Sequence, residues 1–371
     1  MFLHHLELTD YRNYAALSVD FGATKAILLG DNAQGKTNVL EAIGLLATGK
    51  SPVASKDADL VRWGAEQAVI RARVTRELGE TAVDMLIRQS GRRAMRVNGL
   101  AARKLADVLG KVLVVLFRSE DLLLVKGGPA ERREFLDTML VQLSGTHYQQ
   151  LHDYQRVLTQ RNHLLRAIGE GRGSRGALEA FDEQLIQLAL AIWKRRMRLI
   201  AALAPRVAER HAAIAEGKER IGLDYLPSVP LAGPEAGWEA QVRAALAEAG
   251  PKELARGQTL VGPHRDDLAL TIDGRPAKVF GSQGQQRTVV LAMKLAELEH
   301  VREATGEAPL LLLDDVLAEL DVRRQNALLS SIGDDVQTFV TSTHLNDFSA
   351  DWLRQAEIYT VRQGSLLKAK S

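Results

Sequence analysis

The chain has 371 residues, of which 46% are hydrophobic and 25% charged, and its net charge is +2. This composition excludes a disordered protein, and the length fits one large domain or two moderate ones. The absence of cysteine excludes disulfides and cysteine zinc sites. Neither a signal peptide nor an apolar run of the ~20 residues needed for a membrane span is evident. We therefore expect a cytoplasmic protein with no membrane partner.

Both ends of the chain are predicted to combine strands and helices. Three strands are expected within residues 1–30, and residues 68–98 predict a short β-meander that turns at Asn98–Gly99. A further strand is predicted at Val112–Phe117. After Leu260 the pattern again alternates apolar strands, including "PLLLLDD" and "VQTFVTS", with helices after Gln283 and from Val322.

The middle of the chain carries a helical pattern from about Glu131 to Gly217. One row of apolar residues with the spacing of a coiled coil ends at Arg195 and Arg196. Pro205 is expected to interrupt the helix soon afterwards. We therefore predict a compact helical lobe or short arm rather than a long coiled coil. The predicted fold class is α/β. The α/β domain is expected to be split between residues 1–130 and residues 258–371. The inserted helical lobe is expected to cover residues 131–257.

The sequence "GDNAQGKT" at Gly30–Thr37 matches G-x-x-x-x-G-K-[ST] between a predicted strand and a predicted helix. Backbone N–H groups and the helix N-terminus are expected to bind phosphate oxygens. Lys36 is expected to reach the β- and γ-phosphates of ATP and to serve catalysis, and Thr37 to bind Mg²⁺. The alternative is a chance glycine turn. The candidate nucleotide-binding residues here are Gly30, Asp31, Asn32, Ala33, Gln34, Gly35, Lys36, Thr37 and Asn38.

Two aspartates follow the apolar run Leu310–Leu313, which predicts a strand buried on both faces. Asp314 is the expected Mg²⁺ ligand, directly or through water. Asp315 is the candidate catalytic residue that orients or deprotonates the attacking water. The alternative is that either aspartate caps the following helix.

The turn Ser282-Gln283-Gly284-Gln285 opens an apolar helix. Together with the phosphate loop and the Asp314–Asp315 strand end, it resembles the ATP-binding-cassette ATPases. The resemblance implies that Ser282, Gly284 and Gln285 bind the γ-phosphate of ATP held by a second copy of the chain. It also implies that His344 senses the γ-phosphate, whereas taken alone this histidine would be an ordinary strand-end residue.

Within that group the chain resembles the RecF family, which is similar to the SMC and Rad50 ATPases. The resemblance covers nearly the whole chain. The blocks that carry it are "YRNY", "EDLLLVKGGPAERREFLD", "LTQRNHLL", "GPHRDDL" and "LLLDDVLAELD". The chain departs from the family at Ser119, at Val53–Ala54 and at Gln283, which replaces the first glycine of the signature turn.

The resemblance implies an ABC-type ATPase head with a helical insertion, in which ATP and Mg²⁺ drive formation of a homodimer. It implies binding to duplex DNA next to single-stranded gaps, RecO and RecR as partners, and assistance to RecA in repair, replication-fork maintenance and the SOS response. ATP hydrolysis is expected to be slow, DNA-stimulated and to act as a switch. Arg12 and Asn13, in "YRNY", are expected near the nucleotide; the alternative is a surface turn.

Three groups of basic residues, around the predicted hairpin, along one predicted helix and in the next, could bind DNA phosphates. The alternative is that they are ordinary solvated surface charges. The candidates are Arg88, Arg92, Arg93, Arg96, Arg156, Arg161, Arg166, Arg172, Arg175, Lys194, Arg195, Arg196 and Arg198.

The block "GPHRDD", Gly262–Asp267, could suggest metal or acid–base chemistry. We favour the alternative of a buried ionic and hydrogen-bond network. A different reading of the whole chain is a P-loop NTPase or nuclease whose helical lobe binds a substrate. That lobe lacks a pair of carboxylates with convincing metal spacing.

Overall fold

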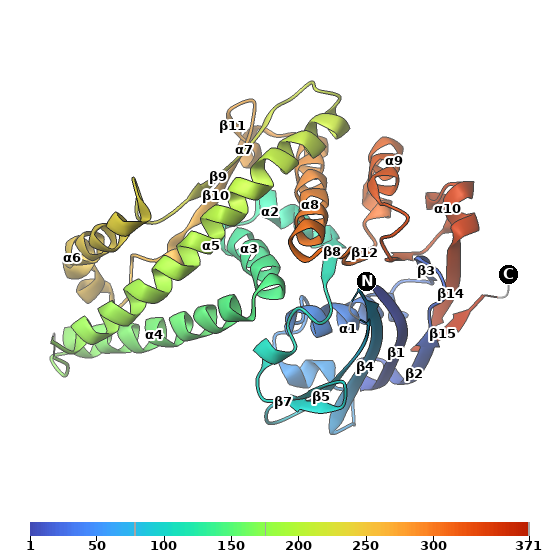
Figure 1. Cartoon of the computed structure of the whole chain (residues 1–371), viewed down its shortest axis with the longest axis horizontal. Coiled ribbons are helices and arrows are strands. Elements are labelled where there is room, and N and C mark those ends of the chain that lie inside the picture. Colours follow the sequence, from blue (N-terminus) through green and yellow to red (C-terminus); the bar gives the residue numbers. More distant parts are fainter. Residues whose placement is uncertain (78, 175, 370–371) are drawn as a thin grey trace. The chain divides into compact units, whose positions relative to one another are not determined.

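The computed structural model of the chain describes residues 1–77, 79–174 and 176–369 (Figure 1). Internal contacts divide it into two compact units, Met1–Leu122 with Val290–Ser371 and Leu123–Val289. The expected α/β fold, with both chain ends in one unit and helices inserted between them, is confirmed. Arg175, one of the candidate DNA contacts, lies outside the described residues.

The first unit contains a mostly parallel sheet with the strand order β15-β14-β3-β13-β12-β8. All neighbouring strands are parallel except β15, which is antiparallel to β14. The strands are β3 (Lys25–Leu29), β8 (Val114–Arg118), β12 (Leu310–Asp314), β13 (Thr338–Ser342), β14 (Ala356–Arg362) and β15 (Ser365–Lys368). Since parallel strands end at one edge, the residues after β3, β12 and β13 meet there.

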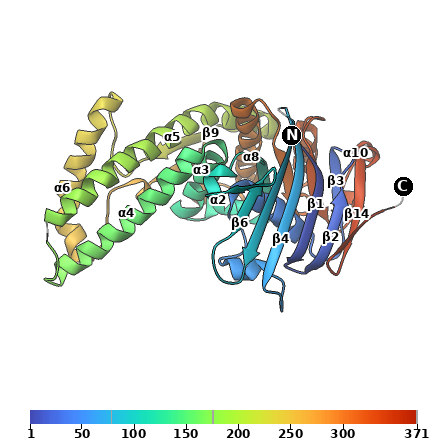
Figure 2. The same ribbon diagram turned by 60° about the horizontal axis from the view of Figure 1, so that its bottom comes forward.

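An antiparallel sheet completes this unit, with the order β2-β1-β4-β5-β6-β7 (Figure 2). Its strands are β1 (Phe2–Tyr11), β2 (Tyr14–Asp20), β4 (Gln67–Arg76), β5 (Gly79–Arg88), β6 (Ala94–Val97) and β7 (Leu100–Ala102). Asn98 and Gly99 both have positive φ in the two-residue hairpin between β6 and β7, as predicted. One hydrophobic core includes side chains of both sheets and of the helix that follows the phosphate loop.

The helices of the first unit are α1 (Lys36–Thr48), α9 (Val322–Ser331) and α10 (Ala350–Gln355), and it includes the later part of α8 (Gln283–Thr305). The alternation of buried and exposed residues in β4 explains why a polar-apolar pattern predicted it. By contrast, Leu310–Leu313 are all fully buried, as expected for a strand covered on both faces.

The second unit is built on two long helices that lie side by side in both views, α4 (Gly145–Gly169) and α5 (Gly176–Ala215) (Figures 1 and 2). Its other helices are α2 (Leu123–Lys126), α3 (Pro129–Leu143), α6 (Trp238–Arg256), α7 (Ala277–Phe280) and the start of α8. A small antiparallel sheet has the order β11-β10-β9 and contains β9 (Ile221–Leu226), β10 (Asp267–Ile272) and β11 (Arg275–Pro276). The fully buried Trp193 anchors the apolar core of α4, α5 and α6.

The prediction that Pro205 interrupts the helix is wrong, because α5 continues through it to Ala215. Proline removes one N–H and leaves the carbonyl four residues earlier without its helical donor. Here both Pro205 and Ala201 lie on the exposed face of α5, so water can reach that carbonyl. None of the helices in the described ranges combines the length and apolar character that crossing a membrane requires.

Candidate nucleotide site

The phosphate loop connects β3 to α1, as the sequence predicts. A Cβ atom at Gly30 would lie 2.4 Å from the carbonyl oxygen of Val361, and one at Gly35 would lie 2.5 Å from the Asn13 amide. Gly35 also has φ +111°, which side chains rarely adopt. Both glycines of the motif are therefore required by close approach of neighbouring groups.

The loop presents a row of backbone donors without acceptors. Within the part of the chain that the structure describes, the N–H groups of residues 31–37 donate no hydrogen bond. Most of these residues are exposed or half-buried. Successive free N–H groups at the start of a helix form a concave site that favours an anion.

Lys36 is folded back over this loop. Its Nζ atom donates to the carbonyl oxygens of Gly30 at 2.7 Å and Asp31 at 3.1 Å, and the residue is only 4% exposed. Neutral carbonyls are weaker partners for an ammonium group than charged oxygens. The arrangement therefore leaves the positive charge of Lys36 available to an anion bound in the loop.

Two strand ends bring hydroxyl and carboxylate groups to the same edge. Thr37 Oγ1 donates to Asp314 Oδ1 at 2.9 Å. Thr341 Oγ1 lies 2.9 Å from Asp314 Oδ1 and 3.3 Å from Asp315 Oδ1. Burial raises the pKa of Asp314, and the nearby charges of Asp315 and Glu120 raise it further, against the lowering effect of the two threonine hydroxyls. A cation at this position would relieve that repulsion.

Asp315 adopts φ +52° at the end of β12. A non-glycine residue in this region costs of order 1–3 kcal/mol and is held there by its surroundings. The N–H of Asp315 donates to Thr341 Oγ1 at 2.8 Å, which fixes the turn. The strained turn places the second aspartate beside the first.

Asn13 lies at the phosphate loop, as expected. Its Nδ2 donates to the Gln34 carbonyl oxygen, and its Oδ1 accepts from Asn38 Nδ2, both at 2.8 Å. Arg12 instead turns to Glu41 in α1, to which it donates two hydrogen bonds of 2.8 and 2.6 Å. The structure therefore brings Asn13, but not the guanidinium of Arg12, onto the loop itself.

Glu41 is a residue of this site that sequence reasoning missed. It is 2% exposed and accepts hydrogen bonds from Tyr11 at 2.9 Å and Ser51 at 2.5 Å in addition to those from Arg12. Burial alone would raise the pKa of Glu41, but the hydrogen bonds from Arg12, Ser51 and Tyr11 outweigh it and lower the pKa. A lone carboxylate inside the apolar stretch "NVLEAIGLL" was the available signal.

The turn between β14 and β15 also belongs to the site and was not predicted. The N–H of Gln363 donates to Gln34 Oε1 at 2.8 Å, and the N–H of Gly364 donates to the Gln34 carbonyl at 3.3 Å. These contacts join residues about 330 positions apart in the sequence. The C-terminal strands therefore support the phosphate loop from outside.

His344 follows β13 at the same edge of the sheet and is exposed. Its backbone N–H donates to Ser342 Oγ at 3.0 Å. Within the described ranges its imidazole makes no hydrogen bond or ion pair with another candidate residue. The structure thus places His344 at the predicted edge without joining its ring to Asp314 or Asp315.

The signature turn lies in the second unit, where it caps α8. The Ser282 N–H donates to Gln285 Oε1 at 2.7 Å, and the Gln285 N–H donates to Ser282 Oγ at 3.2 Å, which is a reciprocal cap. Gln285 also donates to Glu219 Oε1 at 2.8 Å, which fixes its amide. Ser282 is exposed, and Gly284 lies within the first helical turn. The cap leaves the proton of the Ser282 hydroxyl available to an outside acceptor.

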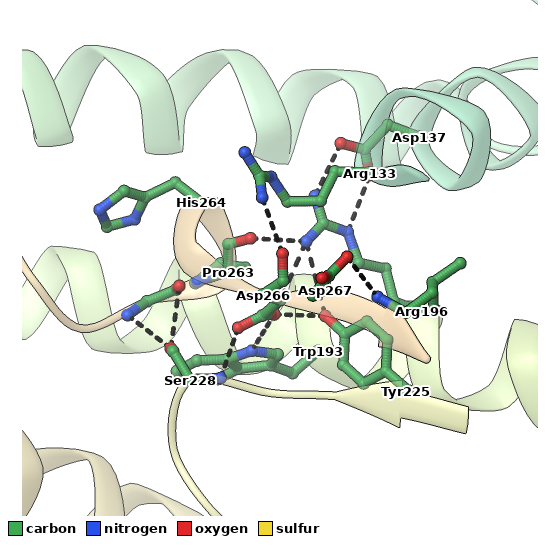
Figure 3. Close-up of polar contacts among 12 residues, drawn as sticks. Arg133, Asp137, Trp193, Arg196, Tyr225, Ser228, Pro263, His264, Asp266 and Asp267 are labelled. Atoms are coloured by element: carbon green, nitrogen blue, oxygen red, sulfur yellow. Dashed lines mark hydrogen bonds and ion pairs between the residues drawn. The ribbon is translucent and has the colours of Figure 1, made fainter. Parts of the chain in front are cut away.

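The block Gly262–Asp267 forms a buried network within the second unit, and the interpretation we favoured is confirmed (Figure 3). Asp266 is fully buried and accepts from Trp193 Nε1 at 2.6 Å, from the Ser228 N–H at 2.7 Å and from the Tyr225 hydroxyl. Asp267 accepts from Nε and Nη2 of Arg132, at 2.6 and 3.0 Å. These contacts join β10 to β9, α3 and α5.

Some of the candidate DNA-binding arginines are excluded by burial. Arg161 and Arg196 are each 3% exposed. Arg161 pairs with Asp182 and Glu253, and Arg196 with Asp137. They were proposed as surface charges because their positions in a helical pattern do not reveal that facing elements cover them.

Comparison with known proteins places this geometry in a family. Residues 2–366 match the model of the RecF/RecN/SMC N terminal domain. Over 370 residues the chain is 48% identical to the DNA replication and repair protein RecF of Synechococcus sp. (strain JA-3-3Ab), covering 99% of this chain and 97% of that protein. It is 45% identical over 369 residues to the RecF protein of Gloeobacter violaceus, covering 99% and 98%.

Solved structures agree with the sequence matches. The chain is similar to a structure of the recombination mediator protein RecF with ATP, in the RecFOR pathway, with a TM-score of 0.91, 32% identity and coverage of 100% and 98%. A Smc head bound to the C-winged helix domain of ScpA shares the fold, at 16% identity, a TM-score of 0.58 and coverage of 100% and 97%. The chain belongs to the RecF family.

Proposed function

We propose that this chain is an ATP-dependent DNA-binding protein of recombinational repair that closes into a head-to-tail dimer on ATP. The observation that carries the proposal is the row of free N–H groups at residues 31–37 beside Lys36. This site fits the β- and γ-phosphates of a nucleotide. RecF relatives whose names give DNA replication and repair, and a related structure with ATP, support it.

The residues beside the loop also fit a magnesium ion. Thr37 and Asp314 offer a hydroxyl and a carboxylate oxygen within 2.9 Å of each other, and oxygen ligands are those that Mg²⁺ prefers. When bound there, Mg²⁺ would neutralise charge on the phosphates. We assign Asp315 to orienting the attacking water, because its turn places it next to Asp314. His344 is assigned to sensing the γ-phosphate, supported by its exposed position at the same edge.

We propose that the signature turn acts on ATP bound to a second copy of the chain. Ser282 supplies its hydroxyl proton and Gly284 permits close approach, while Gln285 holds the turn through its reciprocal cap. A helix N-terminus favours a phosphate group. Since two identical chains would then complete each other's sites, ATP would hold the dimer together and its slow hydrolysis would release it.

DNA, RecO and RecR are proposed as partners, with RecA served indirectly. The support is the similarity to RecF of the RecFOR pathway and to DNA replication and repair proteins. Duplex DNA next to a single-stranded gap is the proposed substrate, bound through phosphate contacts that do not depend on sequence. We place this activity in the cytoplasm.

Size-exclusion chromatography coupled to light scattering tests the proposal. The wild-type chain should be a monomer without nucleotide and a dimer with ATP and Mg²⁺. Ser282→Ala should bind ATP but remain monomeric, because it loses the hydroxyl that is offered to the second copy. The Gln285 N–H also loses its acceptor in the cap, but the bond from the Ser282 N–H to Gln285 Oε1 and the phosphate loop are retained. A wild-type chain that stays monomeric at saturating ATP would overturn the proposal.

A further inference from the structure

One tryptophan of this chain differs from the other three. Trp63 is 98% exposed, whereas Trp193, Trp238 and Trp352 are between 0% and 7% exposed. Tryptophan is a large apolar side chain that folding normally buries, and it is enriched where proteins bind partners. Leaving the whole indole in water therefore points to a binding role.

The backbone holds Trp63 at the tip of a tight turn. The Ala65 N–H donates to the Arg62 carbonyl at 3.0 Å, and Gly64 has φ +86°. These features define a turn with glycine at its third position, and Trp63 precedes that glycine. The tip is thus set by local geometry.

Both ends of this turn are anchored to neighbouring strands. The Arg62 N–H donates to the Asp10 carbonyl at 2.8 Å, next to the end of β1. Gln89, just after β5, donates from its Nε2 to the Ala65 carbonyl at 2.7 Å. An aromatic side chain on an anchored turn loses little backbone entropy when it binds.

Two arginines flank Gln89, the residue that anchors the turn, and the exposed Glu66 also lies beside Gln89. Arg88 ends β5 and Arg92 lies in the following loop, and both are exposed. Arg88 donates to the Arg92 carbonyl, and within the described ranges neither guanidinium pairs with a carboxylate. In the strand order of this sheet, Arg88 and Arg92 lie on the side of β4 that is opposite to β1. They therefore extend away from the strand that borders the phosphate loop. An extended polyanion fits this row better than a single nucleotide does.

We propose that Trp63 stacks on an unpaired base at the junction between duplex and single-stranded DNA, while Arg88 and Arg92 bind the adjacent phosphates. The inference rests on the proposed DNA-binding function and names the residue that distinguishes a junction from an uninterrupted duplex. Within a duplex the faces of the bases are covered by their neighbours. The base that follows the last pair offers an open face, and any of the four bases can stack on an indole.

Binding of two DNA probes tests the inference: a blunt duplex and the same duplex with a single-stranded tail. Trp63→Ala should weaken binding of the tailed probe about tenfold and leave the blunt probe nearly unchanged. Trp63→Phe should keep most of the wild-type affinity for the tailed probe, since phenylalanine also stacks on bases. The matched control is Leu100→Ala, which removes another exposed apolar side chain, 77% exposed, at the far end of the β6–β7 hairpin.

A tailed probe that lacks the base at the junction sharpens the test. The wild-type chain should bind this probe as weakly as Trp63→Ala binds the intact tailed probe. Trp63→Ala should bind the probe without the base no more weakly than that, because both changes remove the same contact. Equal losses on blunt and tailed probes, or additive losses, would overturn the stacking role. If the wild-type chain binds neither probe, the proposed DNA-binding function fails instead.

Fluorescence quenching by acrylamide identifies the occupant, since Trp63 is the exposed tryptophan of the four. Tailed DNA should protect it from quenching, and ATP with Mg²⁺ alone should not. Protection by ATP alone would assign the indole to the nucleotide or to a second copy of the chain, and would overturn the proposal.

Discussion

The phosphate-loop edge and the Asp266 network are both rich in charged and polar groups, but they use them differently. At the loop, Lys36 binds neutral carbonyls, and a row of N–H groups has no acceptor among the residues that the structure describes. In the network, both carboxylate oxygens of Asp266 accept hydrogen bonds, and Arg196 binds Asp137 through two nitrogens. Unused hydrogen-bonding capacity marks the first region as a binding site, and its absence marks the second as structural.

The difference can be tested because the two regions should fail in different ways. A substitution in the network should reduce the free energy of unfolding and leave the ATP affinity of the folded protein unchanged. A substitution at the loop should reduce the ATP affinity and leave the free energy of unfolding nearly unchanged.

Asp266→Ala should cause the largest change. It leaves the buried Trp193 N–H and the half-buried Tyr225 hydroxyl and Ser228 N–H without the carboxylate that accepts from them. We expect a loss of about 3–5 kcal/mol in the free energy of unfolding, measured by urea denaturation. ATP affinity, measured by calorimetry on the folded fraction, should not change. A variant with wild-type stability and weakened ATP binding would contradict the structural role.

Lys36→Met should reduce ATP affinity about 100-fold or more, because it removes the charged donor nearest the phosphates. The free energy of unfolding should change by less than about 1 kcal/mol, since Lys36 gives up hydrogen bonds to neutral carbonyls only. The matched control is Lys25→Met at the start of β3, where Lys25 is 5% exposed and binds Asp334. If both variants lose ATP binding equally, the loss reflects damage to the strand.

His264 should make the network sensitive to acid. Burial lowers the pKa of His264 to about 4, below the value of about 6.5 in an unfolded chain. Since the unfolded state takes up the proton first as the pH falls, stability is complete above about pH 6.5 and declines toward pH 4. We expect about 1–2 kcal/mol to be lost between about pH 7.5 and pH 5, less than the full shift because the ring is partly solvated.

His264→Gln isolates this contribution from those of the other histidines. The variant should lose less stability than the wild type over the same pH range, in paired urea titrations. Identical pH dependence in the two proteins would show that His264 is protonated in the folded state as readily as in the unfolded one.

Glu41→Gln should have the smallest effect, because Glu41 acts on the site through other residues. Its carboxylate fixes Arg12, and thereby Asn13 at the loop. The amide of glutamine cannot accept from all of these donors, so we expect ATP affinity to fall about five- to tenfold. The control is Glu307→Gln, which breaks a similarly buried pair with Arg76 in the same unit. An equal loss of affinity in both variants would mean that Glu41 supports the fold alone.

Local sequence patterns were sufficient to predict the phosphate loop, the buried strand before Asp314 and the helix that opens at the turn Ser282–Gln285. In each case the residues that make the feature are adjacent in sequence, so spacing alone reveals them. Thr37 and Asp314 could be paired in advance because parallel strands end at one edge of a sheet.

The features that escaped prediction depend on contacts between distant segments. Glu41 is explained only by Tyr11, Arg12 and Ser51, and the turn at Gln363 only by its contacts with Gln34. Arg161 and Arg196 carry surface-like charges that facing helices bury. The exposure of Trp63 likewise cannot be read from the string "VRWGAE", since it depends on what the fold leaves uncovered.

Mixing two inactive variants tests the central claim most directly. Lys36→Ala keeps the signature turn but should not bind ATP, and Ser282→Ala binds ATP but offers no hydroxyl to its partner. If each chain completes the other's site, an equimolar mixture with ATP and Mg²⁺ should contain mixed dimers with one intact site, although neither variant dimerises alone. Light scattering should therefore detect dimers in the mixture only. A mixture that remains monomeric, while the wild type dimerises under the same conditions, would contradict the assignment of Ser282 to the ATP of a second chain.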